Sequence, residues 1–241
     1  MTAPYYQDDL TTIYHGDSRE LLASMPRVDL VLTDPPYGID YDPLRRKHWS
    51  AQTSTKNGEH RNARDYGAFA WDKEPFEPAP ILNLDRPSII WGANNFASRL
   101  PDFGSWLCWD KITRNDLQIR QAECELAWAN CLARSRIFRH LWSGGYRASE
   151  SGTPNYHPTQ KPIALMAWCL GLVKGVRTVI DPYMGSGTTL RAAKDAGIKA
   201  IGIEIDERYC EIAARRMSQE VLAFEAPAEA IEQGELYDLA I

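Results

Sequence analysis

The chain contains 241 residues, of which 44% are hydrophobic and 24% are charged, a length and balance typical of one ample globular domain. This composition excludes collagen-like, coiled-coil and wholly disordered chains. The net charge is −5, but residues 220–241 carry six acids and no lysine or arginine, so the remainder is slightly basic and a nucleic-acid partner stays open.

The first predicted element is a strand that starts near Thr12 and ends at Gly16-Asp17, followed by a helix that runs through Met25. Residues 28–33 are an almost continuous apolar run, which is typical of a strand covered on both faces of a sheet. Strand, helix and strand in this order predict one unit of an α/β fold.

The middle of the chain predicts three further strands, over residues 88–92, 105–109 and 123–129. Long polar stretches, residues 40–77 and 131–157, lie before and after these strands and are interpreted as loops. Both loops are basic: residues 44–64 hold six basic side chains against one acid, and residues 131–149 hold four arginines and no acid. Such runs are ordinarily solvated, and the alternative is a surface that binds nucleic acid.

The last third of the chain returns to the strand–helix pattern. Pro162 suits a helix N-terminus, and apolar residues follow it at helical spacing. A strand over 177–180, a glycine-rich turn, a helix ending near Gly197, a strand over 199–205 and a helix capped by Asp206 come next. The sequence therefore predicts a doubly wound, mostly parallel α/β sheet in a single domain over residues 1–241.

Several classes of protein are excluded by what the sequence lacks. The longest apolar run, residues 163–173, is too short to cross a bilayer, and Met1–Pro4 has no secretory-signal layout. We therefore expect a cytoplasmic protein with no membrane partner. Five cysteines without CxxC spacing predict neither a disulfide framework nor a metal site.

The segment Asp34-Pro35-Pro36-Tyr37 follows the strand over residues 28–33, at the edge of the sheet where α/β proteins bind ligands. Two prolines stiffen the turn, so the Asp34 carboxylate and the Pro35 carbonyl form a rigid pair of hydrogen-bond acceptors. This pair suits an exocyclic amine with two hydrogens to donate, on a ring that stacks on Tyr37. The plainer alternative is a turn with a helix-capping aspartate.

A glycine-rich loop, residues 181–189, joins a strand to a helix. It lets a ligand approach the backbone, but it has Leu190 where a dinucleotide site needs a third glycine, and it lacks the Gly-Lys-Ser/Thr of a phosphate loop. Asp181 suits a cationic amino group better than a pyrophosphate. Glu204, at the end of the next strand, suits the two hydroxyls of a ribose. These features predict a nucleoside cofactor that carries an amino group.

Together these segments resemble the DNA amino-methyltransferases that use S-adenosylmethionine. Asp34–Tyr37 is similar to the catalytic tetrapeptide of that family, residues 181–189 to its cofactor loop, and residues 157–162 (HPTQKP) to a third element just before that loop. The catalytic element comes first, as in the permuted β class, and the resemblance reaches about Met217. Weaker matches are residues 16–17, 109–111 and 123–129. The resemblance implies a Rossmann-like methyltransferase fold with circularly permuted motif order.

The resemblance also implies roles for individual residues. The catalytic residues are expected to be Asp34, Pro35, Pro36 and Tyr37. The residues expected to bind S-adenosyl-L-methionine are Asp17, Asp34, Thr159, Gln160, Lys161, Asp181, Pro182, Met184, Gly185, Ser186, Gly187, Thr188, Glu204 and Asp206. Asp17 with Glu20 equally reads as a helix capping box. The basic residues expected to bind DNA are Arg45, Arg46, Lys47, Arg61, Arg64, Arg136 and Arg139.

The activity implied is methyl transfer to the N6 amine of an adenine flipped out of double-stranded DNA. Aspartate at position 34 resembles the adenine-N6 enzymes more than the cytosine-N4 enzymes, which commonly carry serine there, so cytosine N4 is the alternative. A non-catalytic nucleic-acid-binding relative is a further alternative, against which Asp34, Tyr37 and Asp181 argue. A protein or RNA methyltransferase is another, and protein-glutamine relatives usually carry asparagine at that position.

Larger members of the family have a recognition domain between their two halves, and this chain has only loops there. Target recognition is therefore expected from residues 40–77 and 131–157, with residues 220–241 as an acidic tail. Relatives of the β class are often homodimers. The sequence leaves open both a homodimer and a cognate restriction enzyme as partner.

Overall fold

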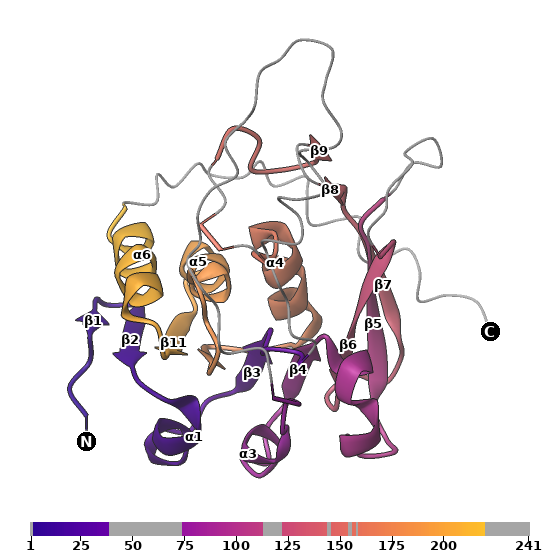
Figure 1. Ribbon diagram of the computed structural model, residues 1–241, viewed down its shortest axis with the longest axis horizontal. Helices are drawn as coiled ribbons and strands as arrows, with labels where there is room; N and C mark the ends of the chain where they lie inside the picture. Colours follow the sequence, from indigo (N-terminus) through magenta and orange to yellow (C-terminus); the bar gives the residue numbers. More distant parts are fainter. Residues whose placement is uncertain are drawn as a thin grey trace.

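The computed structural model describes residues 2–38, 74–112, 122–143, 146–153, 156–157 and 159–219. Its centre is a nine-stranded sheet in the order β1-β2-β11-β10-β3-β4-β6-β5-β7 (Figure 1). These strands are β1 (Tyr6–Gln7), β2 (Thr11–His15), β3 (Leu30–Thr33), β4 (Ser88–Trp91), β5 (Ser105–Asp110), β6 (Cys124–Ala129), β7 (Arg136–Arg139), β10 (Thr178–Asp181) and β11 (Lys199–Glu204). A separate small sheet pairs β8 (Trp142–Ser143) with β9 (Tyr146–Arg147).

The pairing of the strands confirms the predicted α/β fold with a mostly parallel sheet. Strands β2, β11, β10, β3 and β4 are neighbours that run parallel to one another. Strand β6 is antiparallel to β4 and β5, and the edge strand β7 is parallel to β5, so β5 and β7 point the same way as β3. The carboxyl ends of seven strands therefore lie along one edge of the sheet.

Helices cover both faces of the sheet, as a doubly wound fold requires (Figure 1). They are α1 (Ser18–Leu21), α3 (Ala79–Leu82), α4 (Ile163–Leu172), α5 (Thr188–Asp195) and α6 (Glu207–Met217), with 3-10 segments over Leu22–Ser24 and Ala93–Arg99. Helices α4, α5 and α6 lie on one face, and α1 and α3 lie on the other.

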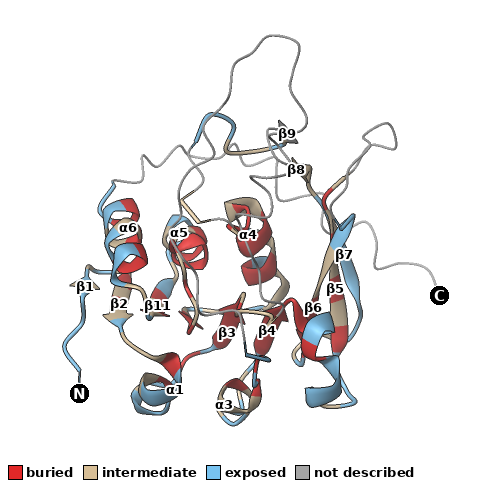
Figure 2. Cartoon of the chain, viewed as in Figure 1, coloured by how far each residue is buried: buried red, intermediate tan, exposed pale blue. Residues whose placement is uncertain are grey.

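Strand β3 contributes to the hydrophobic core on both faces. Leu30 and Leu32 pack in the cluster with α4, α5 and α6, whereas Val31 packs in the opposite cluster with Leu22 and Ile81. All four residues of β3 are buried, as Figure 2 shows in red. This explains the continuous apolar run in the sequence, because successive side chains of a strand point to opposite faces.

Two predicted segments differ from the structure. The helix expected through Met25 is one turn of α1 followed by the 3-10 segment, and Met25 itself is extended. Pro26 accounts for this, since a residue that precedes proline is driven out of the helical conformation. The expected loop over residues 131–157 contains β7, β8 and β9. Phe138 of this segment stacks on Trp168 of α4 at 5.1 Å between ring centroids, and Leu132 and Trp142 pack against the same core.

Several expectations fall on residues outside the described part of the chain. These are most of the basic loop 40–77, including Arg45, Arg46, Lys47, Arg61 and Arg64, and the acidic tail 220–241. Within the described part, no helix is both long and apolar enough to span a membrane.

Candidate active site

The carboxyl edge of the sheet brings together the segments that the sequence singled out. Asp34 follows β3 directly, Asp181 is the last residue of β10, and Glu204 is the last residue of β11. These three strands are adjacent in the sheet. Thr33 links two of them, since its hydroxyl donates to Asp181 Oδ1 at 2.6 Å. The tetrapeptide and the glycine-rich loop are therefore neighbours in space.

Both oxygens of the Asp34 carboxylate have protein partners. Oδ2 accepts a hydrogen bond from Lys161 Nζ at 2.6 Å, and Oδ1 accepts one from the Tyr37 hydroxyl at 2.6 Å. Burial raises the pKa of Asp34, and the positive charge of Lys161 acts in the opposite direction. Tyr37 also receives a hydrogen bond from Lys161 at 3.0 Å. Asp34, Tyr37 and Lys161 thus form one hydrogen-bonded cluster.

The Tyr37 ring packs directly on the backbone of Gly92, immediately after β4. Gly92 adopts a left-handed conformation with φ of 69°, and a Cβ at this position would fall within the tyrosine ring. Two features therefore require glycine at position 92: the left-handed backbone conformation and the space that the Tyr37 ring occupies. This contact fixes where the aromatic face lies relative to Asp34.

Lys161 is almost completely buried, with 5% of its side chain exposed. Its ammonium also contacts Glu125 Oε2 at 3.0 Å, and Glu125 Oε1 contacts Lys111 Nζ at 2.7 Å. Burial acts to raise the pKa of Glu125, but the two lysines together lower it to about 2. Burial acts to lower the pKa of Lys161, whereas Asp34 and Glu125 raise it well above its ordinary value. Glu125 is therefore an anion and Lys161 a cation at neutral pH.

The position of Lys161 adds to the expectation drawn from the resemblance. It was expected among the cofactor residues, and in the structure its ammonium contacts the catalytic tetrapeptide; its contact with the cofactor stays a prediction. The roles of Glu125 and Lys111 were not predicted. The only signal for them was the weak match of residues 109–111 and 123–129, which carried no chemistry by itself.

Asp181 is buried beneath the glycine-rich loop, with 3% of its surface exposed. Neutral groups hold it: the Thr33 hydroxyl at 2.6 Å and the Tyr183 backbone N–H at 3.1 Å. Burial raises its pKa to about 6. Among the described residues no basic side chain forms an ion pair with it. A buried carboxylate that lacks a cation fits a ligand that supplies one.

The loop itself turns on two glycines with positive φ, Gly185 and Gly187, just before α5. Glu204 reaches back to it: Oε2 accepts from the Gly185 N–H at 3.0 Å, and Oε1 accepts from the Asp206 N–H at 2.8 Å. Burial raises the pKa of Glu204 to about 7. Asp206 caps α6 by accepting from the Arg208 N–H, which confirms its predicted capping role.

The remaining predicted cofactor residues surround this loop in different ways. Gln160 Oε1 accepts from the Ser186 hydroxyl at 3.4 Å, and Thr159 bonds to the His157 ring, which packs over Gly185. Asp17 caps α1 through the Arg19 N–H. Four further residues of the predicted cofactor set are buried, namely Pro182, Met184, Ser186 and Thr188.

The two described arginines of the predicted DNA-binding set lie at opposite ends of β7. Both are exposed. Arg139 is at the carboxyl end, on the same edge of the sheet as Asp34, and its nearest acid is Asp110 at 3.8 Å. Arg136 is at the amino end. The two arginines therefore differ in their edge of the sheet and in the contact of Arg139 with Asp110.

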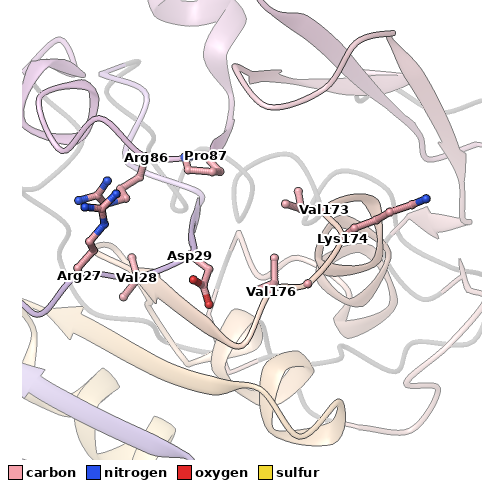
Figure 3. Close-up of a pocket in the computed structure, with 9 residues that line it drawn as sticks. Arg27, Val28, Asp29, Arg86, Pro87, Val173, Lys174 and Val176 are labelled. Atoms are coloured by element: carbon pink, nitrogen blue, oxygen red, sulfur yellow. The ribbon is translucent and has the colours of Figure 1, made fainter.

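A depression of about 300 Å³ lies at the opposite, amino edge of the sheet (Figure 3). Its lining comes from the segments that lead into β3, β4 and β10, and it contains Arg27, Asp29, Arg86 and Lys174. The Asp29 carboxylate there accepts from the backbone N–H groups of Arg177 and Thr178. Asp29 thus ties the start of β3 to the start of β10.

The sheet order, the two loops at its carboxyl edge and the buried acids of those loops define a methyltransferase-type α/β fold. The family model N6_N4_Mtase, described as DNA methylase, matches residues 90–215, more than half of the chain. The chain belongs to this DNA methylase family.

Curated relatives match nearly the full length of the chain. The type II methyltransferase M.ScaI of Streptomyces caespitosus is 29% identical over 90% of this chain and 84% of its own length. The type II methyltransferase M2.DpnII of Streptococcus pneumoniae is 27% identical over 91% of this chain and 94% of its own. The family match and these relatives make the protein a DNA methyltransferase of the N6/N4 type.

Solved structures match the same fold. The crystal structure of the M1.HpyAVI–SAM complex has a TM-score of 0.53 and 26% identity, over 86% of this chain and all of the other. The cytosine-N4-specific PvuII DNA methyltransferase has a TM-score of 0.59 at 17% identity, over 91% of this chain and 90% of the other, and this likeness concerns the fold alone.

Proposed function

We propose that this chain transfers a methyl group from S-adenosyl-L-methionine to the exocyclic N6 amine of an adenine in double-stranded DNA. The observation that carries the proposal is the placement of Asp34 and Tyr37 beside the loop of Asp181, on adjacent strands joined by Thr33. An acceptor for an amine and a buried anion for a cationic cofactor therefore share one edge of the sheet. Family membership supplies DNA as the substrate.

The residues around the glycine-rich loop fit S-adenosylmethionine. Asp181 is a buried anion that suits the ammonium of the methionine part, and Glu204, beside the loop, is proposed to accept from the ribose hydroxyls. The related M1.HpyAVI was solved with this cofactor. When bound, the cofactor supplies an activated methyl group on a sulfonium. Gly185 and Gly187 let the backbone come close to it.

The chain's own part in the reaction centres on Asp34. The amine of a base is a poor nucleophile because its lone pair is delocalised into the ring, and the base must leave the helix to reach a pocket. Hydrogen bonds from the amine to the Asp34 carboxylate and the Pro35 carbonyl localise that lone pair. The Tyr37 hydroxyl, which occupies Asp34 Oδ1, gives way to the amine, and its ring stacks on the base.

Adenine is preferred over cytosine because aspartate stands at position 34, and cytosine N4 remains the second candidate. The test incubates the protein and labelled cofactor with DNA, RNA and protein substrates, followed by nucleoside analysis of the DNA. N6-methyladenine in DNA is the expected product. N4-methylcytosine would replace the adenine assignment, and label in RNA or protein alone would overturn the DNA assignment.

Cofactor affinity is expected to depend on the ionised Asp181 carboxylate. Asp181→Asn removes the charge but keeps the shape, and the loss of a charge-assisted hydrogen bond of about 1.5–3 kcal/mol lowers affinity roughly ten- to a hundredfold. Wild-type affinity should also fall as pH drops below about 6, where Asp181 becomes protonated. Calorimetry with the cofactor alone measures both. An unchanged affinity in the variant would remove Asp181 from the cofactor site.

The same substitution is expected to stabilise the cofactor-free protein. The pKa of Asp181 is about 6 in the folded protein and 3.8 in the reference state, so the folded state holds this proton more tightly. The wild type therefore loses stability as pH rises from about 4 to 6. Asp181→Asn does not, because asparagine has no proton to release in this range. The expected gain at pH 7.5 is of order 1–3 kcal/mol in the free energy of unfolding. Urea titration at pH 4.5 and 7.5 measures it, and a gain equal at both pH values contradicts it.

DNA binding is proposed to involve the loops 40–77 and 131–157 together with β7. Arg139→Gln should lower the salt dependence of DNA binding by about one unit of the log–log slope, because one phosphate contact is lost. Arg136→Gln is the matched control: it removes the same charge from the other end of β7 and should leave the slope unchanged. Fluorescence anisotropy over a salt series measures both. Equal effects would contradict a contact specific to the carboxyl edge.

The proposal also includes assembly and partners. It takes residues 1–241 as one catalytic domain, in which the tail 220–241 has no part in catalysis. The β-class resemblance favours a homodimer, which light scattering of the purified protein tests. The type II relatives favour a cognate restriction enzyme that recognises the same DNA site.

A further inference from the structure

Four charged side chains of alternating sign form a chain that ends at Asp34. Lys111, just after β5, contacts Glu125 on β6 at 2.7 Å, and Glu125 contacts Lys161, just before α4, at 3.0 Å. Lys161 contacts Asp34 at 2.6 Å. The four residues come from four different segments of the fold. Their side chains are largely buried, with 5% of Lys161 and 11% of Lys111 exposed.

Stability alone is a poor explanation for such a chain of charges. Taking ions out of water costs several kcal/mol each, and well-packed apolar residues often replace buried ion pairs without loss. Among the described residues of Lys111, Glu125 and Lys161, the side chain that contacts the catalytic tetrapeptide is that of Lys161. Its ammonium donates to Asp34 Oδ2 and to the Tyr37 hydroxyl. The geometry of the chain of charges is therefore directed at the acceptor carboxylate.

We propose that Lys161 is a positioning residue for methyl transfer: held in place by Glu125 and Lys111, its ammonium fixes Asp34 Oδ2 and keeps that carboxylate an anionic acceptor. This inference rests on the proposed function, because it concerns the acceptor of the amine. Lys161 takes Oδ2 and leaves Oδ1, now bonded to the Tyr37 hydroxyl, as the oxygen that faces the incoming amine.

The charged and titratable groups around Asp34 act on it in opposite directions. Burial raises the pKa of Asp34, Lys161 lowers it and Glu125 raises it. Tyr37 donates to it, and Asp181 adds a further negative charge nearby. Lys111 lies behind Glu125, and the buried His157 has its pKa lowered to about 4, so its ring is neutral. Protonation would turn one oxygen of Asp34 into an O–H donor and leave the other as a weaker, uncharged acceptor.

The test compares pH profiles of single-turnover methylation for Lys161→Met, Lys161→Arg and Glu125→Gln. Activity requires ionised Asp34, so the acid limb of the profile follows its pKa. Lys161→Met should move that limb to higher pH and cut the rate at neutral pH at least tenfold, with cofactor affinity unchanged. Lys161→Arg should restore most of the rate. Glu125→Gln removes a negative neighbour and should move the limb to lower pH.

Shifts of opposite sign are not expected from a role in packing alone. The proposal is overturned if the acid limb of the pH profile stays in place in Lys161→Met and Glu125→Gln. It is also overturned if the limb moves in the same direction in these two variants. A parallel loss of cofactor affinity in Lys161→Met also overturns it, since Lys161 would then belong to the cofactor site. Lys194→Met is the control: its ion pair with Asp8, away from the carboxyl edge, should affect the melting temperature and leave the profile unchanged.

A measurement without DNA separates this inference from the proposed function. Melting temperatures of Asp34→Asn, Lys161→Met and the double variant form a cycle, and the two single shifts should fail to add if the pair is coupled. If the wild type methylates no DNA, the proposed function is lost while the cycle still reports on the pair. Additive shifts overturn the coupling whatever the activity of the wild type.

Discussion

Asp34→Ala is expected to fold and to bind S-adenosylmethionine, yet to transfer methyl groups about 100- to 1,000-fold more slowly than the wild type. The reason is that an acceptor preorganised at the reacting atom contributes about 2.7–4 kcal/mol to lowering the barrier. The loss should be in the chemical step, because Asp181 and Glu204 remain in place on their own strands. Single-turnover methylation of a duplex with one candidate adenine, beside cofactor titration, measures it.

Asp34→Asn is the matched control for this variant. The amide oxygen still accepts a hydrogen bond where Tyr37 now donates, so the local shape is kept while the charge is lost. We expect a smaller loss of rate than for alanine. Lys161 keeps Glu125 as a partner in both variants, so neither leaves a buried ammonium unpaired. Normal methylation by Asp34→Ala would mean that the active site lies elsewhere.

Gly92→Ala is expected to lower the methylation rate roughly ten- to a hundredfold. The added methyl group falls within the Tyr37 ring, which must move away from its present place beside Asp34. Stacking of a base on an aromatic ring contributes about 1–3 kcal/mol, and this is what a displaced ring loses. The rate at saturating cofactor measures the effect.

Gly197→Ala separates this effect from backbone strain. Gly197, just after α5, also has a left-handed conformation, with φ of 68°, but an added Cβ there meets nothing within 4 Å. Both variants should lose about 1–2 kcal/mol of stability from the strained conformation. Only Gly92→Ala should lose activity. Equal losses of activity would show that strain alone, rather than the ring contact, explains the result.

Much of the fold could be predicted because its signals are local. The apolar run before Asp34, the glycines after Asp181 and the cap at Asp206 each depend on neighbouring residues, and the strands they bound lie within two residues of their predicted ends. Strand β7 was missed because only Phe138 in it packs on the core, and its pairing with β5 makes it a strand. The break after α1 depends on Pro26, which outweighs the helical spacing.

The candidate site was predictable only in part, for the opposite reason. Each loop has its own sequence pattern, but Lys161 and Asp34 are 127 residues apart, and no spacing rule connects them. Glu125 has no local signal beyond the weak match of residues 123–129, because an acid in a strand is ordinarily solvated. In the fold, Glu125 is largely buried and the two lysines lower its pKa to about 2. Both effects arise only when the sheet has formed.

Thr33 and Asp29 have a consequence for how the protein meets its ligands. They brace β3 against β10 at both ends: Asp29 holds the start of β10, and the Thr33 hydroxyl holds Asp181 at its end. These contacts join residues that are 148 and 149 positions apart in sequence. They hold β3 and β10 in a fixed position relative to each other. The spacing between Asp34 and Asp181, the residues proposed to hold the amine and the cofactor, is thus set by the paired strands that carry them.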